Sequence, residues 1–332
     1  STRSAVSNAE KKIREILGEE KSARFLDVLR KRISGGGVGI EVARPNAVPT
    51  DTRVVVNAPA YRMDIFENGQ LKKTYRVGIG YPEFPLPTGL RKAETIIFNP
   101  TWTPPDQPWV KGKFAPGKTV AAGSKDNPLG RIKIPIGLPS LIHGGKDPSR
   151  LGTFASHGCV GLTNTQIRDF ASEISALSGS QISPETINGY LKEKDRTKDV
   201  KLGQPVLVEL RYETIVVENG QLKIYRDVYE YGTNTEDNLR RVLDGVGVSF
   251  ESLQPADREK ILAGLESMGT GATGKPVDIE NRQEKANTNK NTNKNEQSDR
   301  VTRNIKGKKE ATFQLAELLG KGYPAPVNLV SR

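Results

Sequence analysis

Short runs of apolar residues, broken by polar positions and turn signals, occupy the middle of the chain and predict short β-strands. These strand patterns begin at 53–56 and continue through 61–66 and 71–79. Asn68-Gly69 lies between the last two runs, and this dipeptide accepts the positive φ angles of a tight turn. The sequence therefore predicts a β-hairpin centred on Asn68-Gly69.

A second hairpin is predicted at 215–228, because the run Glu-Asn-Gly-Gln-Leu-Lys of 67–72 returns at 218–223. Nothing else in the chain repeats, so we interpret these segments as two similar hairpins and not as a duplicated domain. Many short strands without alternating helices favour a mainly β fold, built as an antiparallel β-sandwich, over a parallel sheet.

Helical periodicity outside the strand-rich part predicts peripheral helices. The clearest example follows a capping-box pattern at Thr163 and Gln166, after which apolar residues mark one face as far as Leu177. The other expected helices cover 1–33, 183–194, 257–267 and 313–319. Residues 269–310 are rich in Gly, Asn, Thr and Lys, a composition that cannot bury a core and predicts a flexible segment.

The candidate chemistry is confined to one stretch. The chain contains one cysteine and two histidines. These residues, Cys159, His143 and His157, lie within 17 positions of one another. Thiolate is the reactive form of cysteine, and imidazole titrates nearest to neutral pH. Cys159 is therefore a candidate nucleophile with a histidine as its base. Gly144 and Gly158 adjoin these side chains, and glycine lets backbone N–H groups approach a developing oxyanion.

Two other interpretations compete with catalysis. A single cysteine is usually a small buried apolar residue, and a single histidine is usually a satisfied polar one; the concentration of all three residues in one stretch argues against that. A metal site is excluded because no acidic residue lies at ligand spacing from the thiolate and the imidazoles. We therefore expect neither a metal nor another cofactor.

With these residues in place, the sequence resembles the L,D-transpeptidase family, which has a YkuD-type catalytic domain. The resemblance rests on Ile142-His143-Gly144 followed by Ser156-His157-Gly158-Cys159-Val160, and it covers about 52–178 and 202–210. The family usually has Arg or Asn two residues after the cysteine, where this chain has Gly161. Further motifs precede the histidine in family order: Val56-Asn57 with Pro59, Glu67-Asn68-Gly69, Val77-Gly78-Ile79-Gly80, Pro87-Thr88-Gly89, Asn99 to Pro105, and Asn127-Pro128-Leu129-Gly130.

The resemblance implies a role for each residue of the motif. His143 is expected to be the base, with its second ring nitrogen donating to the backbone carbonyl of Gly144. His157 is a supporting residue beside the thiol, and the backbone N–H groups of Gly158 and Cys159 are expected to form the oxyanion hole. Ser156 is expected to give local support.

The resemblance also implies the substrate, the tetrapeptide stem of peptidoglycan. Cleavage before the terminal D-alanine would give a thioester on Cys159, and transfer to the side-chain amine of another stem would make a 3→3 cross-link. Transfer to water would make the protein a carboxypeptidase, and transfer to a protein amine would anchor that protein to the wall. Carbapenem-type β-lactams are expected to acylate Cys159. A non-catalytic wall-binding protein on the same fold is the alternative from another class.

The domain organisation follows from these patterns. We expect a helical extension and linker at 1–50, the catalytic domain at 51–232 with an insertion at about 180–200, and a C-terminal extension at 233–332. Between Tyr81 and Pro148 prolines and glycines dominate. The aromatic residues of this long loop region either pack over the sheet or line a peptide cleft; they include Trp102, Trp109, Tyr81, Phe84 and Phe114.

Charge adds little to this picture. The formal net charge is +11, which attracts anionic polymers, but no zinc-finger spacing, RNA-binding aromatic motif or basic helix indicates nucleic acid. No apolar run is long enough to span a membrane. The chain starts at Ser1 without an apolar signal region, which we interpret as a mature or trimmed form. We expect a monomer that acts outside the cytoplasm, in the periplasm or cell wall.

Overall fold

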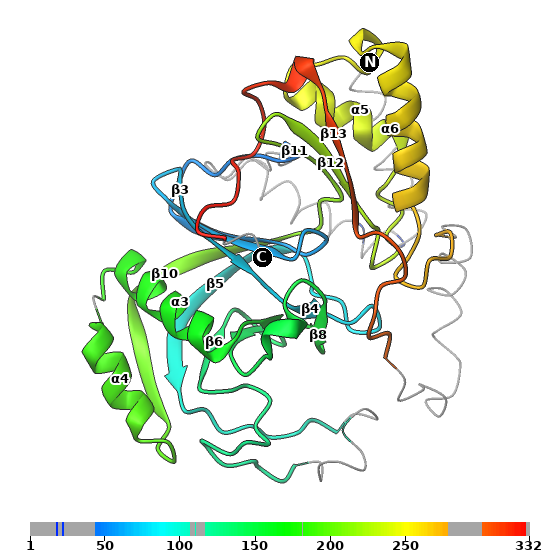
Figure 1. Cartoon of the computed structure of the whole chain (residues 1–332). Coiled ribbons are helices and arrows are strands. Elements are labelled where there is room, and N and C mark those ends of the chain that lie inside the picture. The colour runs from blue at the N-terminus through cyan, green and yellow to red at the C-terminus, as the bar shows by residue number, and fades with distance from the viewer. Residues whose placement is uncertain are drawn as a thin grey trace. The chain divides into compact units, whose positions relative to one another are not determined.

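The computed structural model (Figure 1) describes residues 44–106, 110, 117–180, 182–277 and 301–329, together with Gly18 and Ser22. The chain divides into two compact units, 1–47 and 48–332, and the strands and helices described belong to the second unit. The helix expected at 1–33 lies outside the described residues apart from Gly18 and Ser22, as do Trp109 and Phe114.

An eight-stranded sheet forms the centre of this unit, in the order β3-β2-β1-β10-β5-β6-β7-β9. The predicted mainly β class is confirmed, but the sheet is mixed: β1 pairs with β10 and β7 pairs with β9 in parallel. The long strand β10 returns late in the chain to lie between β1 and β5, a placement that no local pattern indicates. The strands are β1 (Arg53–Asn57), β2 (Arg62–Glu67), β3 (Gln70–Arg76), β5 (Gly89–Phe98), β6 (Ile132–Pro135), β7 (Leu141–His143), β9 (Val160–Gly161) and β10 (Lys198–Arg211).

Both predicted hairpins are present. β2 and β3 pair across Asn68-Gly69, which have φ angles of 50° and 79°. β11 (Ile215–Glu218) and β12 (Gln221–Tyr225) pair across Asn219-Gly220, with φ angles of 47° and 77°. A two-residue turn with positive φ at both positions matches the twist of the flanking strands. The second hairpin belongs to a separate sheet, in the order β11-β12-β13.

Three predicted helices, α3, α4 and α6, are present, and α5 is a further helix that was not predicted. α3 (Asn164–Leu177) begins with the capping box of Thr163 and Gln166 and buries Ile167, Phe170 and Ile174 against the large sheet. α4 (Pro184–Lys192) follows it, and α5 (Glu236–Gly245) and α6 (Pro255–Met268) pack on the small sheet, as Figure 1 shows. None of the helices within the described residues is both long and apolar enough to cross a membrane.

The prediction for the C-terminal segment was wrong in two respects. Residues 313–319 do not form a helix: Phe313 belongs to β13 (Glu310–Gln314), which pairs with β12, and a short 3-10 turn covers Ala316–Leu318. Phe313 is accommodated because α6 has no side chain at Gly264, where a Cβ would lie 2.5 Å from the Phe313 ring. The expected flexibility of 269–310 also fails at both ends, since Ala272 is buried and Val301 and Ile305 pack against the main core.

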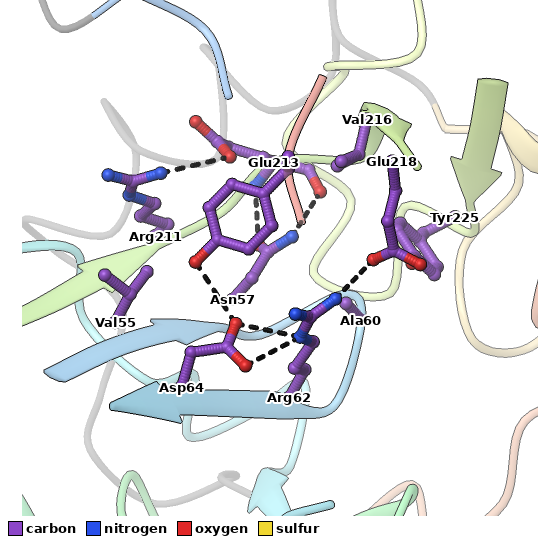
Figure 2. A pocket seen from close by; sticks show the side chains of 11 residues that line it. Val55, Asn57, Ala60, Arg62, Asp64, Arg211, Glu213, Val216, Glu218 and Tyr225 are labelled. Atoms are coloured by element: carbon purple, nitrogen blue, oxygen red, sulfur yellow. Dashed lines mark hydrogen bonds and ion pairs between the residues drawn. The ribbon is translucent and has the colours of Figure 1, made fainter. Parts of the chain in front are cut away.

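A buried charged cluster joins the two sheets. Figure 2 shows the Arg62 guanidinium bonded to the carboxylates of Asp64 and Glu218. Asp64 also accepts hydrogen bonds from Thr74 and Tyr323. All five residues are buried, so loss of one partner would leave an uncompensated charge, which typically costs about 3–5 kcal/mol. The cavity within this cluster is about 20 Å³, enough for a water molecule but not for a peptide. We therefore interpret the cluster as structural.

The remaining short strands, β4 (Ile79–Gly80) and β8 (Phe154–Ser156), pair in parallel and lead directly into the cysteine loop. The Tyr81 N–H donates to the Ser156 carbonyl at 2.9 Å. This small sheet therefore ties the loop that carries His157 and Cys159 to the segment that begins at Gly78.

Candidate active site

The parallel pairing of β7 and β9 brings the motif residues together. His143 lies opposite Gly161 and Ile142 lies opposite Val160. Paired residues of neighbouring strands point to the same side of a sheet, and successive residues alternate. Ile142 and Val160 point into the core and are fully buried, so His143 and Gly161 point to the other side. Cys159 directly precedes β9, so the strand pairing brings the loop that carries Cys159 alongside β7, which ends at His143.

His143 is buried and held by its own backbone neighbour. Only 3% of the residue is exposed, and Nδ1 lies 2.8 Å from the carbonyl oxygen of Gly144. A carbonyl oxygen can only accept, so Nδ1 carries the hydrogen and Nε2 keeps its lone pair in the neutral ring. This hydrogen bond is the one expected from the family resemblance.

Burial lowers the pKa of His143 to about 3, and the positive charge of Lys146 adds to this effect. Hydrogen bonds to the backbone of Gly144 and Leu129 act in the opposite direction but do not compensate. The imidazole is therefore neutral at neutral pH. A neutral ring with an Nε2 lone pair can accept a proton.

Cys159 is a free, half-buried thiol. Burial raises its pKa, whereas the backbone of Leu141 and the charge of Lys146 lower it. The protonated thiol is therefore the resting form, and a base is needed to generate the thiolate.

Ser156 closes the loop that carries Cys159. Its contacts bear on the expectation that the Cys159 N–H forms part of the oxyanion hole. The Cys159 N–H donates to Ser156 Oγ at 3.0 Å, and the same hydroxyl donates to the Cys159 carbonyl. The Cys159 N–H is thus already engaged and is not free for an oxyanion. Gly158 has a φ of 90°, which favours glycine, and its carbonyl accepts a hydrogen bond from Ser140 Oγ at 3.1 Å.

His157 lies on the aromatic side of the cysteine loop. Its ring is half-buried and makes edge contacts with Tyr81 and Phe84, at centroid distances of 5.0 and 4.7 Å. Burial lowers the pKa of His157 to about 4, and Lys146 and Arg303 act in the same direction. Tyr81 and Phe84 thus pack against the loop that carries Cys159, which supports packing as the role of these two rings; a role in a peptide cleft stays a prediction.

Gly144 and Gly145 have a packing role that the sequence pattern did not reveal. A Cβ on Gly144 would lie 2.7 Å from Ile167 Cγ2 and 2.8 Å from Asn164 Oδ1. Asn164 Oδ1 accepts hydrogen bonds from the N–H groups of Gly145 and Arg131. The first residue of α3 therefore holds the loop after His143 in place. The sequence did not indicate this role of Asn164, because asparagine is also common at the start of a helix.

Lys146 is the main residue of the site that the sequence pattern did not indicate. Its charge acts on Cys159, His143 and His157, and its side chain lies against Gly161. No motif could have indicated this, because the contact joins the loop after β7 to strand β9. Among the described residues, no group of three or more His, Cys, Asp or Glu side chains could hold a metal ion.

Comparison with known protein families gives one matching model, the YkuD L,D-transpeptidase catalytic domain, over residues 51–208. Among curated proteins, the probable L,D-transpeptidase YbiS of Escherichia coli is 25% identical over 177 residues, which cover 52% of this chain and 58% of that protein. A putative L,D-transpeptidase of Fuscovulum blasticum is 34% identical over 91 residues, which cover 27% of this chain and 42% of that protein. The chain thus spans about half the length of these curated relatives.

Among solved structures, the chain is similar to the catalytic domain of the E. faecium L,D-transpeptidase. The identity is 17% and the TM-score is 0.30, over 49% of this chain and 99% of that one. A second match is the Ldtfm–avibactam carbamoyl enzyme, with 18% identity and a TM-score of 0.28, over 48% of each chain.

Proposed function

Residues 51–208 place this chain in the L,D-transpeptidase family, and from that premise we propose that it is a cysteine L,D-transpeptidase acting on peptidoglycan tetrapeptide stems. The observation that carries the proposal is the pairing of β7 with β9, which sets His143 opposite Gly161, two residues after Cys159. Cys159 is the only thiol in the chain, and His143 is a neutral ring whose Nε2 can accept a proton.

The proposed reaction has two acyl-transfer steps. His143 Nε2 takes the thiol proton, and the sulfur of Cys159 attacks the carbonyl carbon before the terminal D-alanine. The C–N bond breaks, the departing amine takes the proton from His143, and a thioester remains on Cys159. The side-chain amine of a second stem then attacks the thioester, His143 accepts its proton, and the thiol is restored as a new amide forms. This sequence would give a 3→3 cross-link.

The oxyanion of each tetrahedral intermediate needs hydrogen-bond donors in place before the reaction. Because the Cys159 N–H is held by Ser156, we assign this role first to the N–H of Gly158. The Gly158 backbone is fixed in a left-handed conformation and through the bond from Ser140 to its carbonyl. In this assignment Ser156 shapes the loop and His157 supports the thiol.

Transfer of the acyl group to water or to a protein amine uses the same thioester and stays open as an alternative outcome. A non-catalytic wall-binding protein is the alternative of another class. In the proposal the protein is a monomer that acts outside the cytoplasm on stem peptides, and β-lactams of the carbapenem type acylate Cys159.

The test is intact-protein mass spectrometry after incubation with a carbapenem, followed by peptide mapping. We expect one covalent adduct, located on Cys159. Incubation with a purified tetrapeptide stem should then release D-alanine, and the masses of the products distinguish a cross-linked dimer from a hydrolysed tripeptide. Absence of both an adduct and any product would favour the wall-binding protein.

A further inference from the structure

Gly161 leaves a space next to the cysteine loop that a lysine fills. A Cβ added to Gly161 would lie 2.8 Å from Cγ and 3.0 Å from Cε of Lys146. Carbon atoms in contact normally stay about 3.5–4.0 Å apart. The stem of Lys146 therefore occupies the volume that any larger side chain at 161 would need.

This position adjoins the loop that carries the thiol. Gly161 lies only two residues after Cys159, whereas the intervening Val160 is buried in the core. The backbone anchors the lysine here, since the Lys146 N–H donates to the Leu162 carbonyl at 3.0 Å. Gly145, with a φ of 79°, makes the turn that precedes it.

Several charged groups act on the residues of this site. Lys146 acts on the thiol directly, and Arg150 lies close enough to Lys146 to influence it. Arg303 and Glu83 act on His157 with opposite signs. Lys146 is the group among the described residues whose charge acts on all three of the residues in the proposed machinery: Cys159, His143 and His157.

We propose that Lys146 is a further functional residue of this site: its ammonium group stabilises the Cys159 thiolate, and the glycine at position 161 makes room for it. The inference rests on the proposed role of Cys159 as the nucleophile. It adds the source of positive charge that a buried thiolate requires.

The same charge has a second consequence for proton transfer. Moving the thiol proton to His143 creates an anion on sulfur and a cation on the ring. Lys146 stabilises the anion but disfavours the imidazolium, so the proton on His143 is readily passed on to the departing amine. Burial lowers the pKa of Lys146 to about 8, and the cation is therefore still the main form at pH 7.

The test measures the rate of alkylation of the single cysteine by iodoacetamide between pH 5 and 10, which requires no peptidoglycan substrate. Lys146→Met keeps most of the stem but removes the charge. We expect its thiol to titrate at higher pH and to react about tenfold more slowly at pH 7, which corresponds to about one pKa unit. Lys146→Arg should retain the wild-type profile. Lys125→Ala, at an exposed residue, is the control and should leave it unchanged.

Gly161→Ala provides an independent test of the geometry. Gly161 has no positive φ, so alanine meets no backbone strain there and acts only by displacing Lys146. We expect a shift of the alkylation profile in the same direction as for Lys146→Met. In a Lys146→Ala background the space is vacant, and adding Gly161→Ala should cause no further shift.

An unchanged profile for Lys146→Met, in a protein whose thermal unfolding matches wild type, would overturn the inference. So would strictly additive effects of Gly161→Ala and Lys146→Ala. If the profile shifts as expected but stem peptides are not turned over, the role of Lys146 stands and the proposed substrate is wrong.

Discussion

The two histidines of the candidate site are held by different kinds of contact. On the hydrogen-bonded side of the site, His143 is held by a directional hydrogen bond from Nδ1 to the Gly144 carbonyl, and the glycine loop behind it is held by Asn164. On the aromatic side, His157 contacts the rings of Tyr81 and Phe84. A hydrogen bond selects which nitrogen carries the proton, whereas aromatic packing fixes the position of a ring without selecting a tautomer.

The surroundings of the two rings bear on which histidine is suited to proton transfer. Both rings have a lowered pKa, about 3 for His143 and about 4 for His157, with burial as the main cause in each case. The pKa values therefore do not separate the two roles. The hydrogen bond from Nδ1 to the Gly144 carbonyl leaves Nε2 of His143 able to accept a proton, and on this ground the proposal assigns the base to His143.

The largest effect is expected from replacing Cys159, the proposed nucleophile. Cys159→Ala removes the sulfur and should abolish carbapenem adducts and product from stem peptides, because no other thiol is present in the chain. The small change in volume should leave the unfolding temperature within a few degrees of wild type. Turnover above a few per cent would show that Cys159 is not the nucleophile.

The next largest effect is expected on the hydrogen-bonded side. His143→Ala removes the proton acceptor, and we expect acylation by a carbapenem to slow by about 10²–10⁴-fold, the usual contribution of a general base. The rate should then rise steadily with pH, as direct ionisation of the thiol replaces the base. His143→Gln is the matched control for packing. A normal rate and pH profile in both variants would move the base to another residue.

On the aromatic side the loss should be smaller. His157→Ala deletes two ring contacts, each worth about 0.5–1.5 kcal/mol, and should slow acylation about tenfold while keeping the shape of the pH profile. His157→Phe retains a ring between Tyr81 and Phe84 and should recover most of the rate. If His157→Ala is inactive and His143→Ala still acylates normally, the two histidines have exchanged roles.

The parts of the fold that could be predicted are those set by neighbours in sequence. Asn68-Gly69 and Asn219-Gly220 make their turns with positive φ wherever they occur, and the Thr163 capping box begins α3. The pairing partners were not predictable in this way. The two hairpins have the same six-residue run yet belong to different sheets. The first pairs with the neighbouring strand β1, whereas the second pairs with β13, which comes from a distant segment.

The same division applies to the site. The chemistry of Cys159 and the two histidines could be recognised from residue type, since each is rare in this chain. The contact of Lys146 with Gly161, the engagement of the Cys159 N–H by Ser156 and the support from Asn164 all depend on distances across loops. Residue type indicates what a side chain can do, but only the packed structure determines which neighbour it meets.

The smallest effect should appear in the pH dependence of stability. Each histidine has a pKa near 6.5 in the unfolded chain, but the pKa is about 3 for His143 and about 4 for His157 in the folded protein. Between these values the unfolded chain binds more protons, so the free energy of unfolding falls as the pH is lowered. Each histidine contributes at most about 1.4 kcal/mol per pH unit. The contribution of His157 should end near pH 4, whereas that of His143 should continue toward pH 3.

Urea unfolding of wild type, His143→Gln and His157→Phe at intervals from pH 7 to 3.5 measures these contributions as differences between proteins, in which the carboxylates common to all three cancel. Both variants should depend less steeply on pH than wild type from pH 6.5 to about 4. Below pH 4 the His157→Phe protein should run parallel to wild type, while His143→Gln should still depend less steeply on pH. Parallel curves for all three proteins above pH 4 would mean that neither ring is buried in its neutral form, and the contrast between the two histidines would then lose its electrostatic basis.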